Sequence, residues 1–450
     1  MIPLMRPLNF ILCLAVATHC WAEDNSLSEH AITSAVNIPV SSEFTEAQNL
    51  VNLGLQCSVM GDTEQASTAF QQALQVDSDC ILAHVGMLMS TPPGSEAYKT
   101  HLARLNELMP GAVLTPVEEW YLSTLLQYIS GDLEGTAVAF KERAARYRRD
   151  TLAACWDIVL NHYADKDGTE EITRRAEALL ERYPENPLIH FCSALLEECS
   201  TPPSERALTC ALKASEALPG NPAARLLAGR LLCNAGRAQD AVVLFRKTLD
   251  NTSTDSEAYV IAQLSLISAL VQQHSRNSWV EALKEARKIA QKASSCPLTG
   301  NSGVLLHWEG RTALLRLLVL QKTPPAGQAI NTAAKASNAP DGDPVRIVQD
   351  CLVEAIRARS LAETNRKSAA LEQLSKAEKH YQELQRAGEE IKKKGGISAT
   401  CVRRAEQVCM AAMYRAKIAL YPSTADIWQS HLNEVLQIPQ PRLLPPVLPQ

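Results

Sequence analysis

The sequence predicts an all-α fold, an α-solenoid of antiparallel helix pairs with a degenerate helical-repeat C-terminal half. Three phenylalanines, Phe70, Phe140 and Phe245, are separated by 70 and 105 residues, which are two and three multiples of 35. Glycine keeps the same spacing nine residues earlier, at Gly61, Gly131 and Gly236. Apolar residues in these units recur at intervals of three and four residues, as they do on one face of a helix. A 35-residue unit has room for two helices of about 13 to 15 residues and two tight turns.

The first 22 residues have the pattern of a cleavable secretory signal peptide. Arg6 supplies a short positive start, and residues 10–17 form an apolar run too brief to span a bilayer. We place cleavage after Ala22, which has the small residue Cys20 two positions before it and a polar stretch after it. Lipidation is the alternative, although Thr18 and His19 before Cys20 do not fit that motif. The mature chain is therefore expected to be periplasmic or secreted.

The composition of the mature chain favours neither membrane insertion nor nucleic-acid binding. No later segment has 18 uncharged apolar residues, and the nearest, residues 304–321, contains Glu309, Arg311 and Arg316. Removal of Arg6 changes the formal net charge from −5 to −6, which gives no general attraction for nucleic acid. The basic run at residues 141–149 is assigned to a helix C-terminus, where cations complement the helix dipole. We expect a protein or peptide partner, no nucleic acid and no integral membrane segment.

The mature chain is expected to begin with a flexible leader and to continue as helical repeats. Residues 23–46, rich in Ser, Thr and Glu, form the leader, and the repeats span residues 47–295. In each unit a glycine marks the break between the two helices, because glycine adopts the left-handed conformation that ends a helix. Two turns between units carry Asn186-Pro187 and Asn221-Pro222, 35 residues apart. These prolines suit the first position of a helix, where a missing N–H costs little.

Two units carry the residues of a known repeat. One has Leu50, Leu53-Gly54, Cys57, Ala66, Phe70 and Ala73, and the other has Ala228-Gly229, Leu232, Ala241 and Phe245. They resemble the tetratricopeptide repeat family, whose pattern has a large residue, Leu-Gly and an aromatic, followed by Ala, Phe and Ala. The resemblance covers residues 47–255 apart from a degenerate unit near residues 81–114. It implies a superhelix of helix pairs whose concave groove binds other proteins.

The C-terminal half is expected to be helical without the signature residues. Residues 296–437 are assigned to degenerate helical repeats, including a long hairpin of residues 345–361 with residues 366–391. One face of the second helix carries an apolar stripe, which serves either internal packing or a coiled-coil partner: Leu371, Leu374, Ala377, Tyr381, Leu384, Gly388 and Ile391. Residues 438–450 form a Pro-rich tail, with five prolines in the last 12 residues, expected to be extended.

Eleven of the 13 cysteines lie beyond the signal peptide, which contains Cys13 and Cys20. They are scattered through helical segments without the spacing of a metal site. Burial as small apolar thiols is one interpretation. The other is a disulfide between Cys192 and Cys210, which flank a Thr-Pro-Pro break at similar distances and would face each other on antiparallel helices.

The sequence contains none of the spacings that indicate catalysis. It has no His-Glu-x-x-His pair for zinc, no Gly-x-Ser-x-Gly elbow, and no Gly-rich loop ending in Lys-Ser/Thr for a phosphate. We therefore expect no enzymatic activity, no cofactor and no metal.

The resemblance implies which residues line the groove, because family members use positions 2, 5, 9 and 12 of the first helix. In matching units the main candidates are Gln48, Val51, Leu55, Tyr121, Leu125, Tyr128, Asp157, Asn161, Leu226 and Arg230. Glu118 occupies an equivalent position. This mixture of apolar, aromatic and polar residues suits an extended peptide or a partner helix.

Three functions remain open on the sequence alone. The first is a periplasmic or secreted scaffold that binds a protein or peptide through the groove. The second is a structural subunit of a cell-envelope assembly, packed along the edges of its repeats. The third is an accessory to a glycan-processing enzyme, or an enzyme of that kind whose motif the sequence does not reveal. Because repeat scaffolds vary their surface residues freely, the fold does not choose among these functions.

Overall fold

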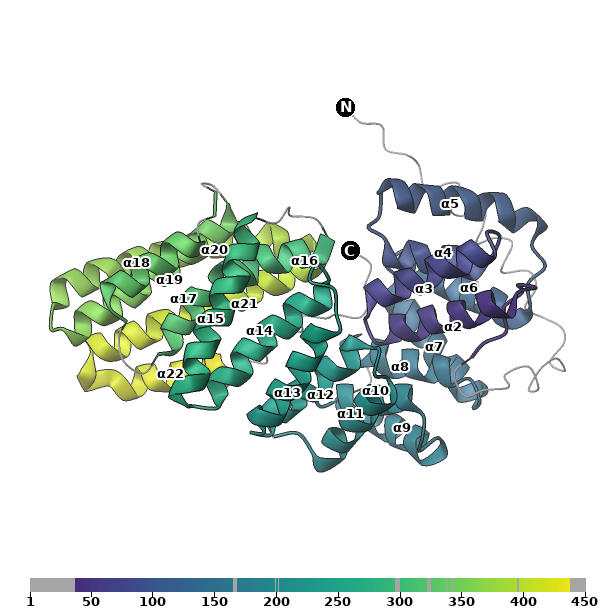
Figure 1. Cartoon of the computed structure of the whole chain (residues 1–450), viewed down its shortest axis with the longest axis horizontal. Coiled ribbons are helices and arrows are strands. Elements are labelled where there is room, and N and C mark those ends of the chain that lie inside the picture. Colours follow the sequence, from purple (N-terminus) through teal and green to yellow (C-terminus); the bar gives the residue numbers. More distant parts are fainter. Residues whose placement is uncertain are drawn as a thin grey trace. The chain divides into compact units, whose positions relative to one another are not determined.

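The structure is a computed structural model that describes residues 37–164, 168–198, 200, 202–295, 300–321, 325–337, 339–340, 343–394 and 396–437. Over these residues the chain forms helices joined by short connections and contains no β-strand (Figure 1). The all-α prediction is therefore confirmed. The expected signal peptide, residues 23–36 of the leader and the Pro-rich tail lie outside the described residues.

The chain divides into two compact units. Over the described residues, unit 1 comprises those of 37–196 together with Glu216–Asn221, and unit 2 comprises Glu197–Ser215 together with those of 222–437.

Unit 1 is a series of short helix pairs that follow one another along the chain. Its helices are α2 (Thr45–Val59), α3 (Thr63–Val76), α4 (Ile81–Ser90), α5 (Glu96–Leu108), the 3-10 turn η1 (Met109–Gly111), α6 (Pro116–Ile129), α7 (Leu133–Arg146), α8 (Thr151–Ala164), α9 (Thr169–Arg182) and α10 (Pro187–Leu195). The degenerate stretch near residues 81–114 is also a helix pair, α4 with α5. The 35-residue spacing thus marks real helix pairs.

The turns between paired helices form where the glycines predict them. Gly61 and Gly131 have φ angles of 75° and 90°, a left-handed conformation that other residues adopt at a cost. The residue after each glycine then caps the next helix, because Asp62 accepts a hydrogen bond from the Gln65 N–H and Asp132 accepts one from the Gly135 N–H. Local sequence therefore fixes where α3 and α7 begin.

The repeat phenylalanines form the core between the helices. Phe70 is fully buried, and a Cβ atom added to Gly54 or Gly86 would lie 2.5 Å from its ring. These glycines let α2 and α4 approach the ring closely, which explains the Leu-Gly signature. Phe140 stacks on Trp156 with a centroid distance of 5.5 Å, so one aromatic layer joins successive pairs.

Unit 2 contains shorter helix pairs followed by three long helices. The helices assigned mainly to it are α11 (Glu205–Ala217), α12 (Pro222–Asn234), α13 (Ala238–Asp250), α14 (Glu257–Gln272), α15 (Arg276–Ser295), α16 (Gly300–Leu305), the π-helical turn η2 (Leu306–Gly310), α17 (Arg311–Leu320), α18 (Gly327–Ser337), α19 (Pro344–Glu363), α20 (Lys367–Lys394), α21 (Gly396–Leu420), the 3-10 turn η3 (Pro422–Thr424) and α22 (Ala425–Gln437). As predicted, α19 and α20 form a long hairpin.

The apolar stripe of α20 is used mostly for internal packing. Leu374, Ala377 and Leu384 are buried, and α20 packs against both α19 and α21. Leu371, at the beginning of the stripe, is 44% exposed. Of the two interpretations of the stripe, the structure favours internal packing, with one exposed end.

A buried carboxylate links η2 to two other helices of unit 2. Glu309 is 1% exposed and pairs with Arg316 of α17 and with Arg404 of α21, the latter at 3.3 Å from the Arg404 Nε. Burial alone would raise the pKa of Glu309, but the two guanidinium groups more than offset this and hold the pKa below its ordinary value. Glu309 therefore remains ionised inside unit 2.

Among the helices that the structure describes, none is both long enough and apolar enough to cross a membrane.

Candidate functional site

The structure places eight of the ten predicted groove residues in the interior. They are Val51, Leu55, Tyr121, Leu125, Tyr128, Asp157, Asn161 and Leu226, each at most 3% exposed. Six of the eight are apolar or aromatic, and burial of each such side chain stabilises the fold by roughly 1.5–3 kcal/mol. These residues are core residues, which corrects the expectation that they line an open groove.

The polar members of this buried set bind other residues of unit 1. The Tyr121 hydroxyl donates to Asp150 at 2.7 Å, and Asp150 also pairs with Arg143 at 2.5 Å. Asn161 donates to the Asp157 carboxylate at 2.7 Å. Their hydrogen-bonding capacity serves the fold, because a buried polar group without a partner is costly.

Arg230 of unit 2 is partly exposed but is paired with Glu198, which is buried. Arg230 is therefore bound by a residue of its own unit. Its place in a groove is implied only by the family resemblance. Gln48 is the remaining groove candidate, and it contacts a segment of the chain itself.

Residues 37–44, which we call the N-terminal segment, form no helix and lie against the helices of unit 1. Ile38, Val40 and Ser42 are buried, whereas the residues between them are partly or fully exposed. This alternation with a period of two is that of a strand with one covered face. The expectation of a flexible leader over residues 23–46 is therefore wrong for the N-terminal segment, because alternating apolar residues gain by burial.

Three carboxamide side chains on α2 hold the N-terminal segment. Gln48, Asn52 and Gln56 are four residues apart, so they share one face of the helix, and we call them the amide stripe. The Asn52 amide donates to the Ile38 carbonyl at 3.0 Å and accepts from the Ile38 N–H at 2.7 Å. The Gln48 amide donates to the Ser42 carbonyl at 2.6 Å, and Gln56 reaches the Asn37 side chain at 3.4 Å.

These contacts set the direction of the N-terminal segment. Ser42 lies beside Gln48 at one end of the amide stripe, and Asn37 lies beside Gln56 at the other. The segment therefore runs antiparallel to α2. Asn52 and Gln48 bind main-chain atoms, which every residue type presents, so this part of the recognition does not depend on side-chain identity.

Two carboxylates recognise the serines of the N-terminal segment. Glu118 of α6 is 2% exposed and accepts from the Ser41 N–H at 2.7 Å and also from the Ser41 hydroxyl. Asp77, which follows α3, accepts from the Ser42 hydroxyl at 2.5 Å. Glu118 also closes a capping box with Thr115 at the start of α6, which fixes the position of its side chain. The contacts of Glu118 and Asp77 with the two hydroxyl groups, unlike the main-chain contacts of Asn52 and Gln48, select hydroxyl side chains.

Gln48 and Glu118 were groove candidates from the sequence, whereas Asn52, Gln56 and Asp77, which contact the same segment, were not. The family scheme selects positions 48, 51, 55 and 58, whereas the chain uses positions 48, 52 and 56 of the same helix. The missing signal was available, because three carboxamides at intervals of four form a polar stripe on one helix face.

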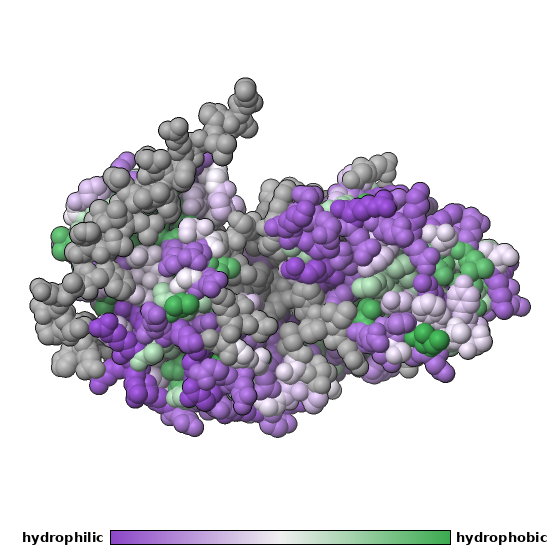
Figure 2. All heavy atoms as spheres, turned by 180° about the vertical axis from the view of Figure 1, so that it is seen from behind, coloured by the Kyte–Doolittle hydropathy of each residue, from purple (hydrophilic) through white to green (hydrophobic). Residues whose placement is uncertain are grey.

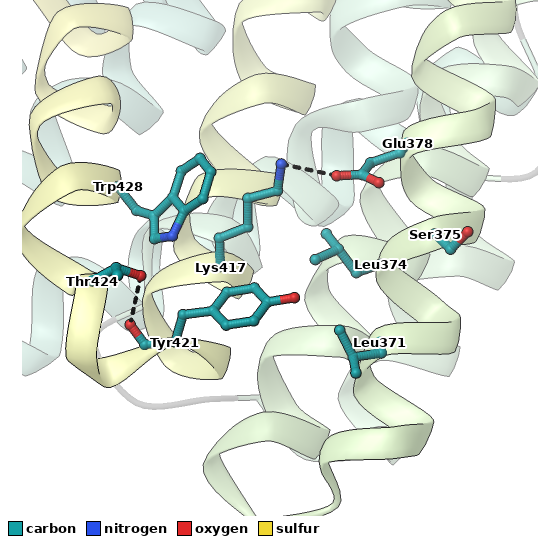
Figure 3. Close-up of a pocket in the computed structure, with 8 residues that line it drawn as sticks. All are labelled: Leu371, Leu374, Ser375, Glu378, Lys417, Tyr421, Thr424 and Trp428. Atoms are coloured by element: carbon teal, nitrogen blue, oxygen red, sulfur yellow. Dashed lines mark hydrogen bonds and ion pairs between the residues drawn. The ribbon is translucent and has the colours of Figure 1, made fainter.

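Unit 2 has a separate cavity of about 380 Å³ between α20, the end of α21, η3 and α22 (Figure 3). One wall carries Leu371, Leu374, Ser375 and Glu378, and the other carries Lys417, Tyr421, Thr424 and Trp428. The Lys417 ammonium pairs with Glu378 at 2.8 Å and lies 4.8 Å from the centre of the Trp428 ring. Tyr414 stacks on the same Trp428 at 6.1 Å, which holds the indole in place. The cavity thus combines aliphatic and aromatic walls with one ion pair and two hydroxyl side chains, Ser375 and Thr424, whereas the amide stripe is made of carboxamides.

Exposed apolar residues do not form a large patch on the face drawn in Figure 2. Hydrophilic residues predominate there, and hydrophobic residues occur as small separate spots. At and near the cavity of unit 2, Leu371, Tyr421 and Ile427 are 44%, 39% and 55% exposed.

The predicted disulfide between Cys192 and Cys210 is not formed. Cys192 instead lies beside Cys155 of α8, and this contact together with burial raises the pKa of the Cys155 thiol. Burial also raises the pKa of Cys57 to about 12. Buried thiols of raised pKa are neutral and unreactive, in line with the interpretation of the cysteines as apolar core residues.

Over the described residues, no group of three or more His, Cys, Asp or Glu side chains is placed to hold a metal ion.

Comparison with known proteins gives only remote likenesses. The sequence matches no protein-family model and no curated protein. The human IFIT1 dimer with m7Gppp-AAAA is 13% identical with a TM-score of 0.38, and the match covers 90% of this chain and 79% of that chain. The human IFIT1 dimer with PPP-AAAA is 14% identical with a TM-score of 0.34, over 88% of this chain and 89% of that chain. Likenesses at these TM-scores carry no argument about the function of this chain.

Proposed function

We propose that this chain is an exported helical scaffold that binds a protein partner in an extended conformation along α2 of unit 1. The proposal assigns it no catalytic step. Export is supported by the sequence of residues 1–22. The binding role is supported by one observation above all: Asn52 pairs with both main-chain groups of Ile38.

This observation supports peptide binding because a side-chain amide matches the donor and acceptor of one peptide unit. Such pairing fixes an extended chain without reading its side chains, as strand addition does at a sheet edge. Helix–helix packing needs no such group, since the face of a helix presents no unpaired main-chain N–H. An amide at Asn52 is therefore suited to an extended ligand.

The test uses a full-length variant with an opened surface, Ile38→Asp with Val40→Asp. Two carboxylates cannot remain buried without partners, so the N-terminal segment should leave α2. We expect this variant to retain a defined exported protein from the secreted or envelope fraction of the native cell. Addition of Asn52→Ala should abolish that retention.

Leu53→Ala is the matched control, because Leu53 is also on α2 but is 48% exposed. It should leave retention unchanged. Equal retention by the opened variant with and without Asn52 would contradict the proposal.

A further inference from the structure

We infer that the α2 surface recognises extended protein segments with the pattern apolar, any residue, apolar, hydroxyl, hydroxyl. Residues 38–42 of the chain have this pattern and occupy the surface, so they compete with a partner for it. This inference rests on the proposed function and adds the chemistry of the ligand and a control on its access.

The pattern follows from the contacts of each position. Ile38 and Val40 are buried and set the two apolar positions, and Pro39 between them is partly exposed. Ser41 and Ser42 set the hydroxyl positions, because Glu118 and Asp77 accept hydrogen bonds from their hydroxyl groups. Alternate burial with main-chain pairing at Asn52 requires the ligand to be extended.

The two carboxylates also define what the surface rejects. A phosphate or a carboxylate at either hydroxyl position would be placed against Glu118 or Asp77, and like charges at this distance repel. Threonine keeps the hydroxyl and is accepted. The ligand class is thus an extended protein segment with uncharged hydroxyl side chains at these two positions, and a segment phosphorylated at either of them is excluded.

The N-terminal segment competes because it is attached directly to α2, which begins at Thr45. A tethered ligand experiences an effective concentration in the millimolar range. A free ligand binds only the fraction of molecules whose surface is open, so its apparent affinity falls in proportion to that fraction. Release of the segment should therefore raise affinity for any ligand of this class.

Binding of a synthetic peptide tests the inference. A fluorescent peptide with the sequence of residues 36–43 is titrated by anisotropy against the full-length chain and against the Ile38→Asp, Val40→Asp variant. We expect the variant to bind the peptide at least about ten times more tightly than the intact chain. Asn52→Ala in the variant should weaken binding about tenfold or more, and phosphorylation of the peptide at either serine should abolish binding.

The outcomes separate this inference from the proposed function. Equal affinity of the intact chain and the variant for the peptide would contradict the role of residues 38–42 as a competitor. The scaffold role would still stand if the variant retains a protein partner. Failure of the variant to bind the peptide would overturn the ligand pattern. Peptide binding without any retained protein would refute the scaffold role alone.

A second measurement covers the case in which the double variant does not fold. Amide hydrogen exchange of the intact chain should show slow exchange at Ile38 and Ser41, whose N–H groups are bound by Asn52 and Glu118. Asn52→Ala alone should speed exchange at Ile38. Fast exchange at both amides in the intact chain would show that the N-terminal segment does not occupy the surface.

Discussion

The amide stripe of unit 1 and the cavity of unit 2 show two ways in which paired helices present side chains of different chemistry. The amide stripe is polar, contacts main-chain atoms and is covered by residues 37–44 of the same chain. The cavity is lined by aliphatic and aromatic side chains with one ion pair, Lys417 with Glu378. Contacts to main-chain atoms do not depend on side-chain identity, whereas contacts in the cavity depend on the side chains that line it. Helix pairing sets neither property, which depends on the few side chains that each surface presents.

The largest effect on stability is expected from removing Glu309, the buried carboxylate that pairs with two arginines in unit 2. Glu309→Ala leaves Arg316 and Arg404 without their shared carboxylate, and loss of one partner from a buried pair costs about 3–5 kcal/mol. Chemical denaturation followed by circular dichroism measures the loss. Glu372→Ala is the control, because its pair with Lys376 is exposed and should contribute at most about 1 kcal/mol. Similar losses in both variants would show that Glu309 is not a structural centre of unit 2.

The two units should respond to pH with opposite signs. Burial raises the pKa of Asp62 in unit 1 to about 6, above its unfolded value of 3.8. Its contribution is therefore present below pH 3.8 and is lost as the pH rises through about 6, an effect of on the order of 3 kcal/mol. The lowered pKa of Glu309 in unit 2 has the reverse effect, because its contribution is present above the unfolded value and is lost as the pH falls through the folded value.

Asp62→Asn tests the first half of this contrast. Asparagine still caps a helix, so α3 should keep its start, but the pH dependence of unit 1 between about pH 4 and pH 6 should flatten. Hydrogen exchange resolved by peptide measures the two units separately. An unchanged pH profile for the peptides of unit 1 would show that Asp62 does not titrate there.

A smaller effect is expected from the aromatic wall of the cavity. Trp428→Ala removes the stacking on Tyr414 and the contact with the Lys417 ammonium, which together should lower the stability of unit 2 by about 1–3 kcal/mol. Thermal unfolding measures the change. Exchange at Ile38 should not change, and an increase there would show that the two surfaces are coupled.

The smallest effect is expected at the ion pair of the cavity. Lys417→Met keeps most of the aliphatic stem over Trp428 and removes the charge, so stability should change by less than about 1 kcal/mol. A loss as large as that of Trp428→Ala would mean that the charge, and not the ring, holds this wall in place.

The fold could be predicted from the sequence because its signals are local. The turn at Gly61, the helix start at Pro187 and the packing of Phe70 each depend on residues within one or two repeats. The long hairpin of α19 and α20 also followed from apolar periodicity alone.

The candidate site could be predicted only in part, because its contacts join distant parts of the sequence. Ser41 meets Glu118 across 77 residues, and Ser42 meets Asp77 across 35 residues. No pattern within one helix indicates such pairs. The groove residues taken from the family resemblance failed for a different reason: Tyr121 and Leu125 are large enough to complete the core of this chain, and the chain buries them.

Because the N-terminal segment packs on α2, displacement of this segment by a partner would also change the stability of unit 1. Ile38 and Val40 are buried beside α2, so the N-terminal segment supplies apolar cover to this part of unit 1. Any partner that displaces them must replace that cover, or unit 1 loses stability. A partner of the right pattern should therefore raise the unfolding temperature of a chain whose segment is released, and should hardly change that of the intact chain. The unfolding temperature thus indicates whether the N-terminal segment or a partner protein lies on α2.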